Sequence, residues 1–418
     1  MKPSFYQENR EALCGLLPDG DWTAIVSSGE RLPRSADEEY DFQVNTNFYY
    51  LTGISQPNVC LMLTRRNGRV TETLFVDAYD EMYAKWIGHR LTKEEAADLS
   101  GIATDHIYYR NEYDAMLKEW LKGAKSFYLD LEKARNVNFN SFGLQTAKDY
   151  EGTGVEIRDI YPYLDALRSA KQPEEIELLK KAIAVTNQGI QSLMKHAKTG
   201  MYEYQLEAYF DHVIKDSGNR IVSFKTIAAS GENATVMHYS ANNSVLKDGD
   251  LILFDLGCRE QGYCADISRT FPINGKYTPL QRQIYDIVLA ANKKIIEVAK
   301  AGMSLLQLQE ICTETLAQGC LDAGLISTKE EIKKYYIHSV SHSIGLDTHD
   351  TFNNRQAPLP SGAVISDEPG LYFPQYRIGV RVEDDLLLTE NGAVNLSADI
   401  IKEADEIEKF MEENRVHE

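Results

Sequence analysis

The sequence predicts an α/β protein of two domains, and three observations lead to this fold class. The chain has 418 residues, more than one hydrophobic core usually serves. Its first part alternates short apolar runs, typical of strands, with stretches of helical periodicity. Its second part contains an internal repeat of about 100 residues, which indicates two similar halves packed about a pseudo-twofold axis.

The first domain is predicted from alternating strand-like and helix-like segments. Strands are expected at residues 22–27, 59–64 and 73–76, where apolar residues run together or alternate. Helices are expected at residues 93–99 and 113–121, where apolar residues recur with helical spacing. This alternation predicts an α/β domain.

A long amphipathic helix is predicted to open the second domain. Pro173 stands at its start, with Glu174 and Glu175 in its first turn, where proline and acidic side chains are favoured. Its apolar stripe consists of Ile176, Leu179, Ile183, Ile190, Leu193 and Ala197. We place the boundary just before this helix, so that the two domains span residues 1–168 and 169–418.

The internal repeat consists of two helix–glycine–helix junctions in the second domain. Residues 197–201 (AKTGM) and 299–303 (AKAGM) are each followed, at the same offset, by Gln-Leu. Two unrelated junctions could also give this match by chance. Functional sites often lie between such halves, and the candidate ligands named below fall in both of them.

Composition and charge exclude several classes of protein. The net charge of -19 at pH 7 argues against nucleic-acid binding, which needs Lys and Arg to displace phosphate counterions. No apolar run is long enough to span a membrane, and residues 1–10 lack the apolar core of a signal peptide. The six cysteines are scattered without a Cys-x-x-Cys pair, which is typical of a reduced chain. We therefore expect a cytoplasmic protein that binds neither nucleic acid nor membrane.

Five residues that favour metal ions lie in the C-terminal half of the chain. They are Asp255, Asp266, His342, Glu368 and Glu383. Four carboxylates and one imidazole form an oxygen-rich set, which suits a pair of divalent ions such as manganese better than a single tetrahedral zinc. Two metal ions held a few ångströms apart can generate a nucleophilic hydroxide at neutral pH. The set makes the chain a candidate hydrolase.

The two aspartates are predicted to lie side by side on neighbouring strands. Asp255 ends the apolar run that begins at residue 251, and Asp266 lies in a second strand that follows a turn. If the turn is centred on residues 260–261, the two are cross-strand partners with side chains about 5 Å apart. Buried carboxylates that close repel each other unless a proton or a cation lies between them. The alternative is a solvated hairpin with polar ends.

Three histidines stand within twelve positions, out of nine in the chain. His338 and His342 are four apart, but neither has the adjacent Glu of a helical zinc-protease motif, and Gly345 follows closely. We therefore expect a strand or loop in which only one of the two needs to be a ligand. A lone His is more often structural, but His349 completes a cluster that favours function.

The last two carboxylates stand in strand-like segments. Glu368 precedes a Pro-Gly turn at the end of a predicted buried strand, where the backbone can hold it rigidly. Glu383 shares one face of a predicted strand at residues 379–383 with Arg381, which could pair with a site carboxylate or reach the substrate. Either glutamate alone would be interpreted as a surface acid.

The order and settings of these residues closely resemble those of the pita-bread metallopeptidases, and among them the Xaa-Pro peptidases. The matching stretches are DLG (255–257), YCADISRTFP (263–272), HSVSHSIGLDTHD (338–350), EPGLY (368–372) and RVEDD (381–385). Residues 45–53, 86–90 and 168–176 resemble the N-terminal domain and linker of aminopeptidase P enzymes, so the resemblance covers essentially the whole chain. It implies a creatinase-like α/β N-terminal domain followed by a pita-bread catalytic domain with a pseudo-twofold repeat.

The resemblance implies a site with two divalent metal ions, with manganese favoured over cobalt, zinc or iron. Asp255 would chelate one ion, and Asp266 and Glu383 would bridge both. His342 and Glu368 would hold the second ion. A hydroxide that bridges the ions would attack the carbonyl before a proline, and Glu368 would accept and pass on the proton.

The resemblance also implies roles for residues around the metal ions. His238 would lie near the scissile bond, and His349 would stabilise the tetrahedral intermediate. His338, Tyr372 and Arg381 would line the proline-facing pocket or brace the metal carboxylates, and Arg381 is also a candidate catalytic residue. In tetrameric members, the residue that matches Trp86 reaches a neighbouring subunit's site. We therefore expect a homodimer or homotetramer in which Trp86 contacts substrate.

Three positions depart from the family pattern. Ser268 replaces a more usual Thr but keeps the hydroxyl group. Ser339 stands where Gly is common, which could shift the local backbone. Asp367 precedes Glu368 where Val or Ile is usual, and its carboxylate could point away from the site or alter metal affinity.

We therefore predict an aminopeptidase that hydrolyses the N-terminal Xaa-Pro bond of peptides. The nearest alternative is a prolidase, which uses the same chemistry on Xaa-Pro dipeptides; the N-terminal resemblance favours the aminopeptidase. A catalytically inactive peptide-binding member of the fold, or a creatinase-like hydrolase, would lack metal ligands that this chain retains.

Overall fold

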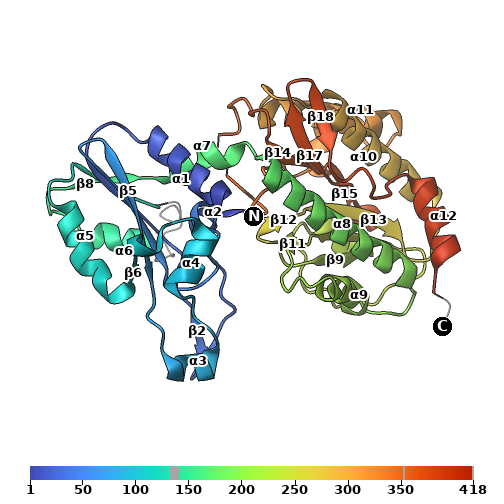
Figure 1. The fold of residues 1–418 in the computed structure, drawn as a ribbon. Helices are drawn as coiled ribbons and strands as arrows, with labels where there is room; N and C mark the ends of the chain where they lie inside the picture. The colour runs from blue at the N-terminus through green and yellow to red at the C-terminus, as the bar shows by residue number, and fades with distance from the viewer. Residues whose placement is uncertain (132–140, 352–353, 417–418) are drawn as a thin grey trace. The chain divides into compact units, whose positions relative to one another are not determined.

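The computed structural model describes residues 1–131, 141–351 and 354–416, and the chain divides into two compact units. Unit 1 comprises Met1–Leu167 and unit 2 comprises Arg168–Glu418 (Figure 1). None of the described helices is long and apolar enough to cross a membrane. Both units combine helices with sheets, which confirms the predicted α/β class.

A mixed six-stranded sheet forms the centre of unit 1. Its strand order is β6-β5-β4-β1-β7-β8, with β1 antiparallel to β4 and parallel to β7. The strands are β1 (Trp22–Ser27), β4 (Cys60–Arg66), β5 (Arg69–Val76), β6 (Ile107–Tyr109), β7 (Ser126–Leu129) and β8 (Glu156–Asp159). The three strands predicted from the sequence coincide with, overlap or lie within β1, β4 and β5, so these predictions are confirmed.

Helices cover the faces of this sheet. On one face, α5 (Tyr113–Leu121) and α6 (Phe142–Asp149) pack over a buried cluster that includes Ile25, Met62 and Leu117. On the other side, α1 (Pro3–Leu16), α2 (Thr46–Thr52) and α4 (Lys93–Ser100) pack against one another (Figure 1). The helices predicted at residues 93–99 and 113–121 correspond to α4 and α5.

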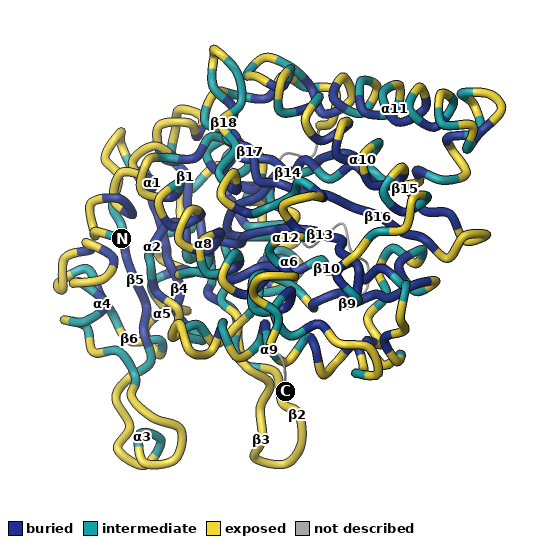
Figure 2. The backbone as a smooth tube through the Cα atoms, turned by 90° about the vertical axis from the view of Figure 1, so that its right-hand side faces the viewer, coloured by how far each residue is buried: buried dark blue, intermediate teal, exposed yellow. Residues whose placement is uncertain are grey.

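Two segments of unit 1 have no share in its core. The hairpin of β2 (Pro33–Ser35) and β3 (Glu38–Glu39) is exposed, and α3 (Glu81–Ile87) has no buried residue. Figure 2 shows the hairpin in the colour of exposed residues and α3 as exposed to intermediate, and both segments project. Trp86 lies on α3 and is 77% exposed.

Two helix pairs give unit 2 its repeated organisation. α8 (Pro173–His196) packs against α9 (Glu203–Asp216), and α10 (Pro279–Val298) packs against α11 (Leu305–Asp322). One copy of the sequence repeat joins each pair, and antiparallel strands follow each pair. The predicted long helix is α8, with its proline in the first turn and Glu175 in a capping box.

The strands of unit 2 form small antiparallel sheets around one core. In the first half, β9 (Ile227–Ser230), β10 (Leu251–Leu256) and β13 (Ile267–Pro272) pair, with the short hairpin of β11 (Arg259–Glu260) and β12 (Tyr263–Cys264) beyond them. In the second half, β14 (Val364–Asp367), β17 (Asp384–Thr389) and β18 (Gly392–Asn395) pair, and β15 (Gly370–Phe373) pairs with β16 (Ile378–Arg381). One buried apolar cluster joins both halves and α12 (Ala404–Asn414).

The pairing of β10 with β13 differs from the predicted register. Asp255 lies opposite Ser268, not opposite Asp266. The reason is the turn, whose central residues Gln261 and Gly262 both have positive φ (46° and 93°), as a two-residue type I′ turn requires. The turn is therefore centred one position later than expected, which shifts the pairing by two residues. Because side chains alternate with a period of two, the aspartates still share one face, as diagonal neighbours.

Candidate active site

Unit 2 contains a cavity of about 590 Å³, a size typical of sites for small ligands. The predicted site residues that line it are Asp255, Asp266, Glu368, Glu383, His238, His338, His342, His349 and Arg381. In the first half, one lies between β9 and β10, one on β10 and one directly before β13. In the second half, the three histidines precede β14, the two glutamates lie directly after β14 and directly before β17, and the arginine ends β16. The two halves of the repeat therefore meet at this cavity.

Three side chains in the cavity wall come close enough to share a metal ion. Ligand atoms of Asp266, His342 and Glu383 lie within 4.8 Å of one another. His342 Nε2 lies 3.3 Å from Asp266 Oδ2 and 3.4 Å from Glu368 Oε1. His342 Nδ1 lies 3.1 Å from the carbonyl of Ser343, so the network assigns the ring proton to Nδ1 and leaves the lone pair of Nε2 facing the carboxylates.

The carboxylates of this cluster repel one another. Burial raises the pKa of Asp266 well above its usual value, and Glu383, Asp255 and Asp385 raise it further. Burial also raises the pKa of Glu383, with Glu368 and Asp255 adding to the effect. Among the described residues, no donor reaches Asp255 Oδ1 or Glu383 Oε1, although both atoms are buried. Unpaired anionic oxygens in a buried acidic cluster need cations, so this donor set fits divalent metal ions.

Glu368 combines a raised pKa with access to the cavity. Its side chain is 16% exposed, and burial raises its pKa while His342 and Arg381 oppose the rise. Ser366 Oγ donates to Glu368 Oε1 at 3.3 Å and accepts from the backbone N–H of His342 at 3.0 Å. Ser366 thus ties the glutamate to the segment that carries the imidazole.

Arg381 braces two of the carboxylates. Its Nη2 donates to Asp255 Oδ2 at 2.6 Å, and its Nε donates to Ser268 Oγ at 2.7 Å. Ser268 Oγ in turn donates to Glu383 Oε2 at 2.7 Å. The guanidinium therefore holds Asp255 directly and Glu383 through Ser268. The hydroxyl that Ser268 shares with the usual Thr makes both bonds.

Tyr372 is buried and is not among the residues that line the cavity, but it links two residues that do, Arg381 and His338. Arg381 Nη1 donates to Tyr372 Oη at 3.1 Å, and Tyr372 Oη donates to His338 Nε2 at 2.8 Å. His338 Nδ1 lies 2.8 Å from the carbonyl of Ser339, so the ring proton is assigned to Nδ1. Burial and the charge of Arg381 lower the pKa of His338 to about 4, so the ring is neutral at pH 7. The contact of His338 with Ser339 uses only the backbone, which a Gly at that position would also offer.

Two further histidines face the cavity. His238 follows the short turn η4 (Gly231–Thr235) and is exposed to the cavity. His349 is exposed on its cavity side, and its ring centroid lies 4.3 Å from that of His342. Desolvation of its inner atoms and the neighbouring His342 lower the pKa of His349 to about 4. A neutral His349 can therefore donate a hydrogen bond to a group in the cavity.

Asp367 is buried, and the residues found to line the cavity do not include it. Asn292 of α10 donates to Asp367 Oδ2 at 2.9 Å, and Lys402 donates to Asn292 Oδ1 at 2.7 Å. Burial and Asp384 raise the pKa of Asp367, and Lys402 partly opposes the rise. The extra carboxylate therefore belongs to a polar network around Asn292. No sequence pattern pointed to this network, because its members lie far apart along the chain.

Sequence reasoning also missed part of the cavity wall. The additional lining residues are Ser223, Phe224, Lys225, Ile227, Met237, Ser240, Asp347 and Thr348. Most lie in segments without a metal-favouring pattern, so nothing in their spacing pointed to them. Asp347 and Thr348 lie beside His349 in the 338–350 stretch, where that neighbourhood was a usable signal.

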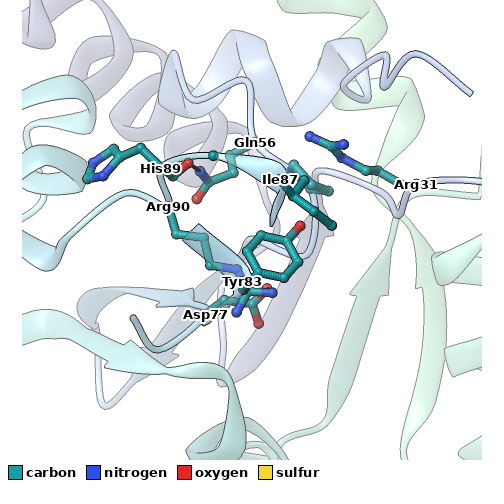
Figure 3. A pocket seen from close by; sticks show the side chains of 9 residues that line it. Arg31, Gln56, Asp77, Tyr83, Ile87, His89 and Arg90 are labelled. Carbon is teal, nitrogen blue, oxygen red and sulfur yellow. Dashed lines mark hydrogen bonds and ion pairs between the residues drawn. The ribbon is translucent and has the colours of Figure 1, made fainter. Parts of the chain in front are cut away.

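Unit 1 contains a small hollow beside the residues that follow Trp86. The Arg90 guanidinium lies 3.6 Å from the centroid of the Tyr83 ring and 3.6 Å from Asp77 Oδ2 (Figure 3). The hollow measures about 30 Å³, which is room for a water molecule and not for a peptide. Trp86 itself is exposed on α3 of unit 1, and its predicted contact with substrate stays a prediction.

Comparison with known proteins gives matches along the whole chain. The Xaa-Pro aminopeptidase of Escherichia coli is 32% identical, over 97% of each chain. Xaa-Pro aminopeptidase 3 of Rattus norvegicus is 31% identical, over 93% of this chain and 81% of that protein. A solved Bacillus anthracis structure, provisionally assigned as an aminopeptidase P, is 45% identical with a TM-score of 0.96, and covers 100% of both chains. The zinc-substituted E. coli aminopeptidase P in complex with product is 30% identical with a TM-score of 0.90, again over 100% of both chains.

Two family models divide the chain between them. Residues 177–390 match metallopeptidase family M24, and residues 6–128 match the aminopeptidase P N-terminal domain. The fold and the carboxylate-rich cavity thus define a metallopeptidase with a pita-bread catalytic domain. With both models matched, the chain belongs to metallopeptidase family M24 and, within it, to the aminopeptidase P family.

Proposed function

We propose that the chain is an Xaa-Pro aminopeptidase, which removes the N-terminal residue of peptides that have proline in second position. The observation that carries the proposal is the convergence of four carboxylates and His342 on one cavity in unit 2. The match of residues 6–128 to the aminopeptidase P N-terminal domain favours this activity over that of a prolidase. The E. coli and rat relatives are both Xaa-Pro aminopeptidases.

In this proposal the acidic cluster holds two divalent metal ions. Asp255 would be a ligand of one ion, and His342 and Glu368 would be ligands of the other. Asp266 and Glu383 would be ligands of both. Ions held there would supply a nucleophilic hydroxide at neutral pH and polarise the scissile carbonyl. Manganese suits so many oxygen ligands, although the E. coli relative has also been obtained with zinc.

The chain's own side chains orient the peptide and move the proton. Glu368, whose pKa burial raises, accepts a proton from the attacking water and passes it to the proline nitrogen as the bond breaks. His238 lies near the scissile bond, and neutral His349 donates a hydrogen bond to the oxygen that becomes negative. His338 and Tyr372 form the side of the pocket that faces proline.

Arg381 and Ser268 support this chemistry by orienting two of the carboxylates. Their hydrogen bonds hold Asp255 and Glu383 in fixed orientations, which a rigid ligand set requires. Arg381 is also counted among the catalytic residues, because its guanidinium reaches the cavity wall beside Asp255.

The proposal extends to the organisation of the whole chain. We assign residues 1–168 to an aminopeptidase P-type domain and residues 169–418 to the catalytic domain. A homodimer or homotetramer would bring the exposed Trp86 of one chain to the substrate of another. A cytoplasmic location fits the six buried cysteines, none of which forms a disulfide.

The test is a peptide panel assayed with and without manganese. Xaa-Pro-Yaa tripeptides should be cleaved, Xaa-Ala controls should not, and chelation of metal should abolish turnover. Cleavage of Xaa-Pro dipeptides alone would identify a prolidase. A purified protein without bound divalent ion that manganese fails to activate would contradict the peptidase itself.

A matched pair of variants tests the assignment of the site. Glu383→Ala should lower kcat at least about 1,000-fold while the chain stays folded, because Glu383 bridges both ions. Glu390→Ala removes an exposed acid from the same region and should leave kcat unchanged. Retained turnover in Glu383→Ala would mean that the site is misassigned.

A further inference from the structure

A buried group of ion pairs joins the start of unit 2 to the loop that carries His349. Arg168 Nη2 lies 2.5 Å from Asp350 Oδ1, and Lys171 Nζ lies 2.9 Å from Asp350 Oδ2. The three side chains are only 1–2% exposed. Both oxygens of Asp350 therefore have a cationic partner away from water. None of these three residues has a role in the proposed chemistry.

Arg168 holds the loop on both sides of His349. Its Nη2 also lies 2.9 Å from Asp347 Oδ2, so one guanidinium contacts the acids that flank Thr348 and His349. Thr348 and His349 line the cavity, whereas the Asp350 side chain is turned into the protein. A short segment with both ends held by one rigid, planar cation has little freedom to rotate its central residues.

Backbone hydrogen bonds also hold the loop that carries His349. The N–H of Asp350 donates to the carbonyl of Ser343 at 2.9 Å, and the N–H of Gly345 donates to that of Asp347 at 3.1 Å. The N–H of Cys264, in β12, donates to the carbonyl of Gly345 at 2.8 Å. The loop is therefore closed on itself and attached to the hairpin that leads to the acidic cluster.

Gly345 permits the close approach of the ion pairs to this loop. A Cβ atom at residue 345 would lie 2.1 Å from Asp350 Oδ2 and 3.0 Å from Lys171 Cε. Any side chain there would displace the carboxylate from its cations. The loop and the two cationic residues are thus fitted to each other at atomic contact.

Asp350 stays ionised in this setting. Burial alone would raise its pKa, but Arg168 and Lys171 outweigh burial and lower the pKa below its usual value. The Asp350 carboxylate is therefore anionic at neutral pH and pairs with both cations there.

We propose that Arg168, Lys171 and Asp350 are positioning residues that hold His349 against the reacting carbonyl. The inference rests on the proposed function, because it assumes that His349 contacts the substrate. Such residues act through His349 alone, so they affect the chemical step and have little effect on metal binding or peptide binding.

A double-mutant cycle separates positioning from general stability. Asp350→Asn keeps the size of the side chain and removes the charge that both cations require. On an Ala-Pro-Ala peptide with manganese, this change should lower kcat by about 10- to 100-fold and leave KM within about threefold. In a chain that already carries His349→Ala, the same change should lower kcat by less than about twofold, because the group being positioned is absent.

An equal loss of kcat in both backgrounds would overturn the inference, since a structural role is additive with His349. So would an unchanged kcat in Asp350→Asn, or no effect of His349→Ala itself. Inactivity of the unaltered chain with every metal would instead reject the proposed function, so the two failures are distinguishable.

A second pair of variants covers the case in which Asp350→Asn does not fold. Arg168→Lys keeps the positive charge but replaces the planar guanidinium, whose Nη2 reaches both acids, by a shorter side chain with a different head group. Arg168→Met removes the charge as well. The expected order of kcat is unaltered chain, Arg168→Lys, Arg168→Met, with equal manganese content in all three. Identical kcat values for the folded variants and the unaltered chain would contradict the proposal that Arg168 positions His349.

Discussion

The hydroxyl of Ser268 connects Arg381 to Glu383 in the acidic cluster through two hydrogen bonds. It accepts a hydrogen bond from Arg381 and donates one to Glu383, both at 2.7 Å, and the residue is fully buried. Ser268→Ala would leave a charged donor and a charged acceptor without this partner in a site that water reaches poorly. Bonds to charged groups of this kind contribute about 1.5–3 kcal/mol each.

Part of that loss should appear as weaker metal binding. If the less well oriented Glu383 weakens the free energy of manganese binding by about 2 kcal/mol, the affinity for manganese falls about 30-fold. This agrees with the about 10- to 100-fold effects of losing a hydrogen bond behind a metal ligand. The measurement is peptidase activity as a function of free manganese concentration, which gives an apparent dissociation constant for each variant.

Ser268→Thr is the matched control. It keeps the hydroxyl and adds one methyl group, as in the more usual family sequence, so the manganese dissociation constant should stay within about threefold. The reasoning is refuted if Ser268→Ala binds manganese as tightly as the unaltered chain. It is equally refuted if the Thr variant is as impaired as the Ala variant, because the hydroxyl would then not be the relevant group.

Three further predictions concern stability. Burial raises the pKa of Glu175 to about 7 from an ordinary value of 4.5, because the buried carboxyl is more stable in its neutral form. The contribution of this group to the free energy of unfolding is fully present below pH 4.5 and is lost as the pH rises through 7. Glu175→Gln cannot ionise, so its free energy of unfolding does not fall in this way. The free energy of unfolding of Glu175→Gln minus that of the unaltered chain should therefore rise by about 2–3 kcal/mol between pH 5 and pH 8, and the difference in thermal midpoint should rise with it. The exposed Glu174→Gln is the control, and parallel pH curves for Glu175→Gln and the unaltered chain would contradict the prediction. Gly257→Ala would place a Cβ atom 1.8 Å from the carbonyl oxygen of Ala265, which should destabilise unit 2 by about 1–3 kcal/mol. Gly15→Ala, within helix α1 of unit 1, meets nothing within 4 Å and should leave stability unchanged or raise it by up to about 1 kcal/mol in the same calorimetric scan. Chelation should lower the thermal midpoint of unit 2, and manganese at about 100 times its dissociation constant should restore about 2.7 kcal/mol. Glu383→Ala should lack this response to manganese, and an equal response would place the ions elsewhere.

Local sequence patterns were sufficient to predict most of the helices and strands expected from the sequence. The helix that begins at Pro173 and the strand that ends near Asp255 follow from side-chain periodicity and terminal signals, which depend only on residues close in the chain. The register of β10 and β13 was wrong by two positions because it depends on the positive φ of Gln261, a backbone state that a glutamine seldom adopts. Gly262 indicates a turn, but nothing in the sequence identifies Gln261 as its other central residue.

The sequence by itself determined which side chains are available for the chemistry. Four carboxylates, a histidine cluster and an arginine in strand-like settings predicted an oxygen-rich metal site, because ligand preference is a property of the side chain. Only the tertiary structure decided how they are held. Ser268 and Arg381 are 113 positions apart, and Arg168 and Asp350 are 182 apart. Periodicity says which face of an element a residue occupies but not which other face it meets, so such contacts arise only when the two halves pack together.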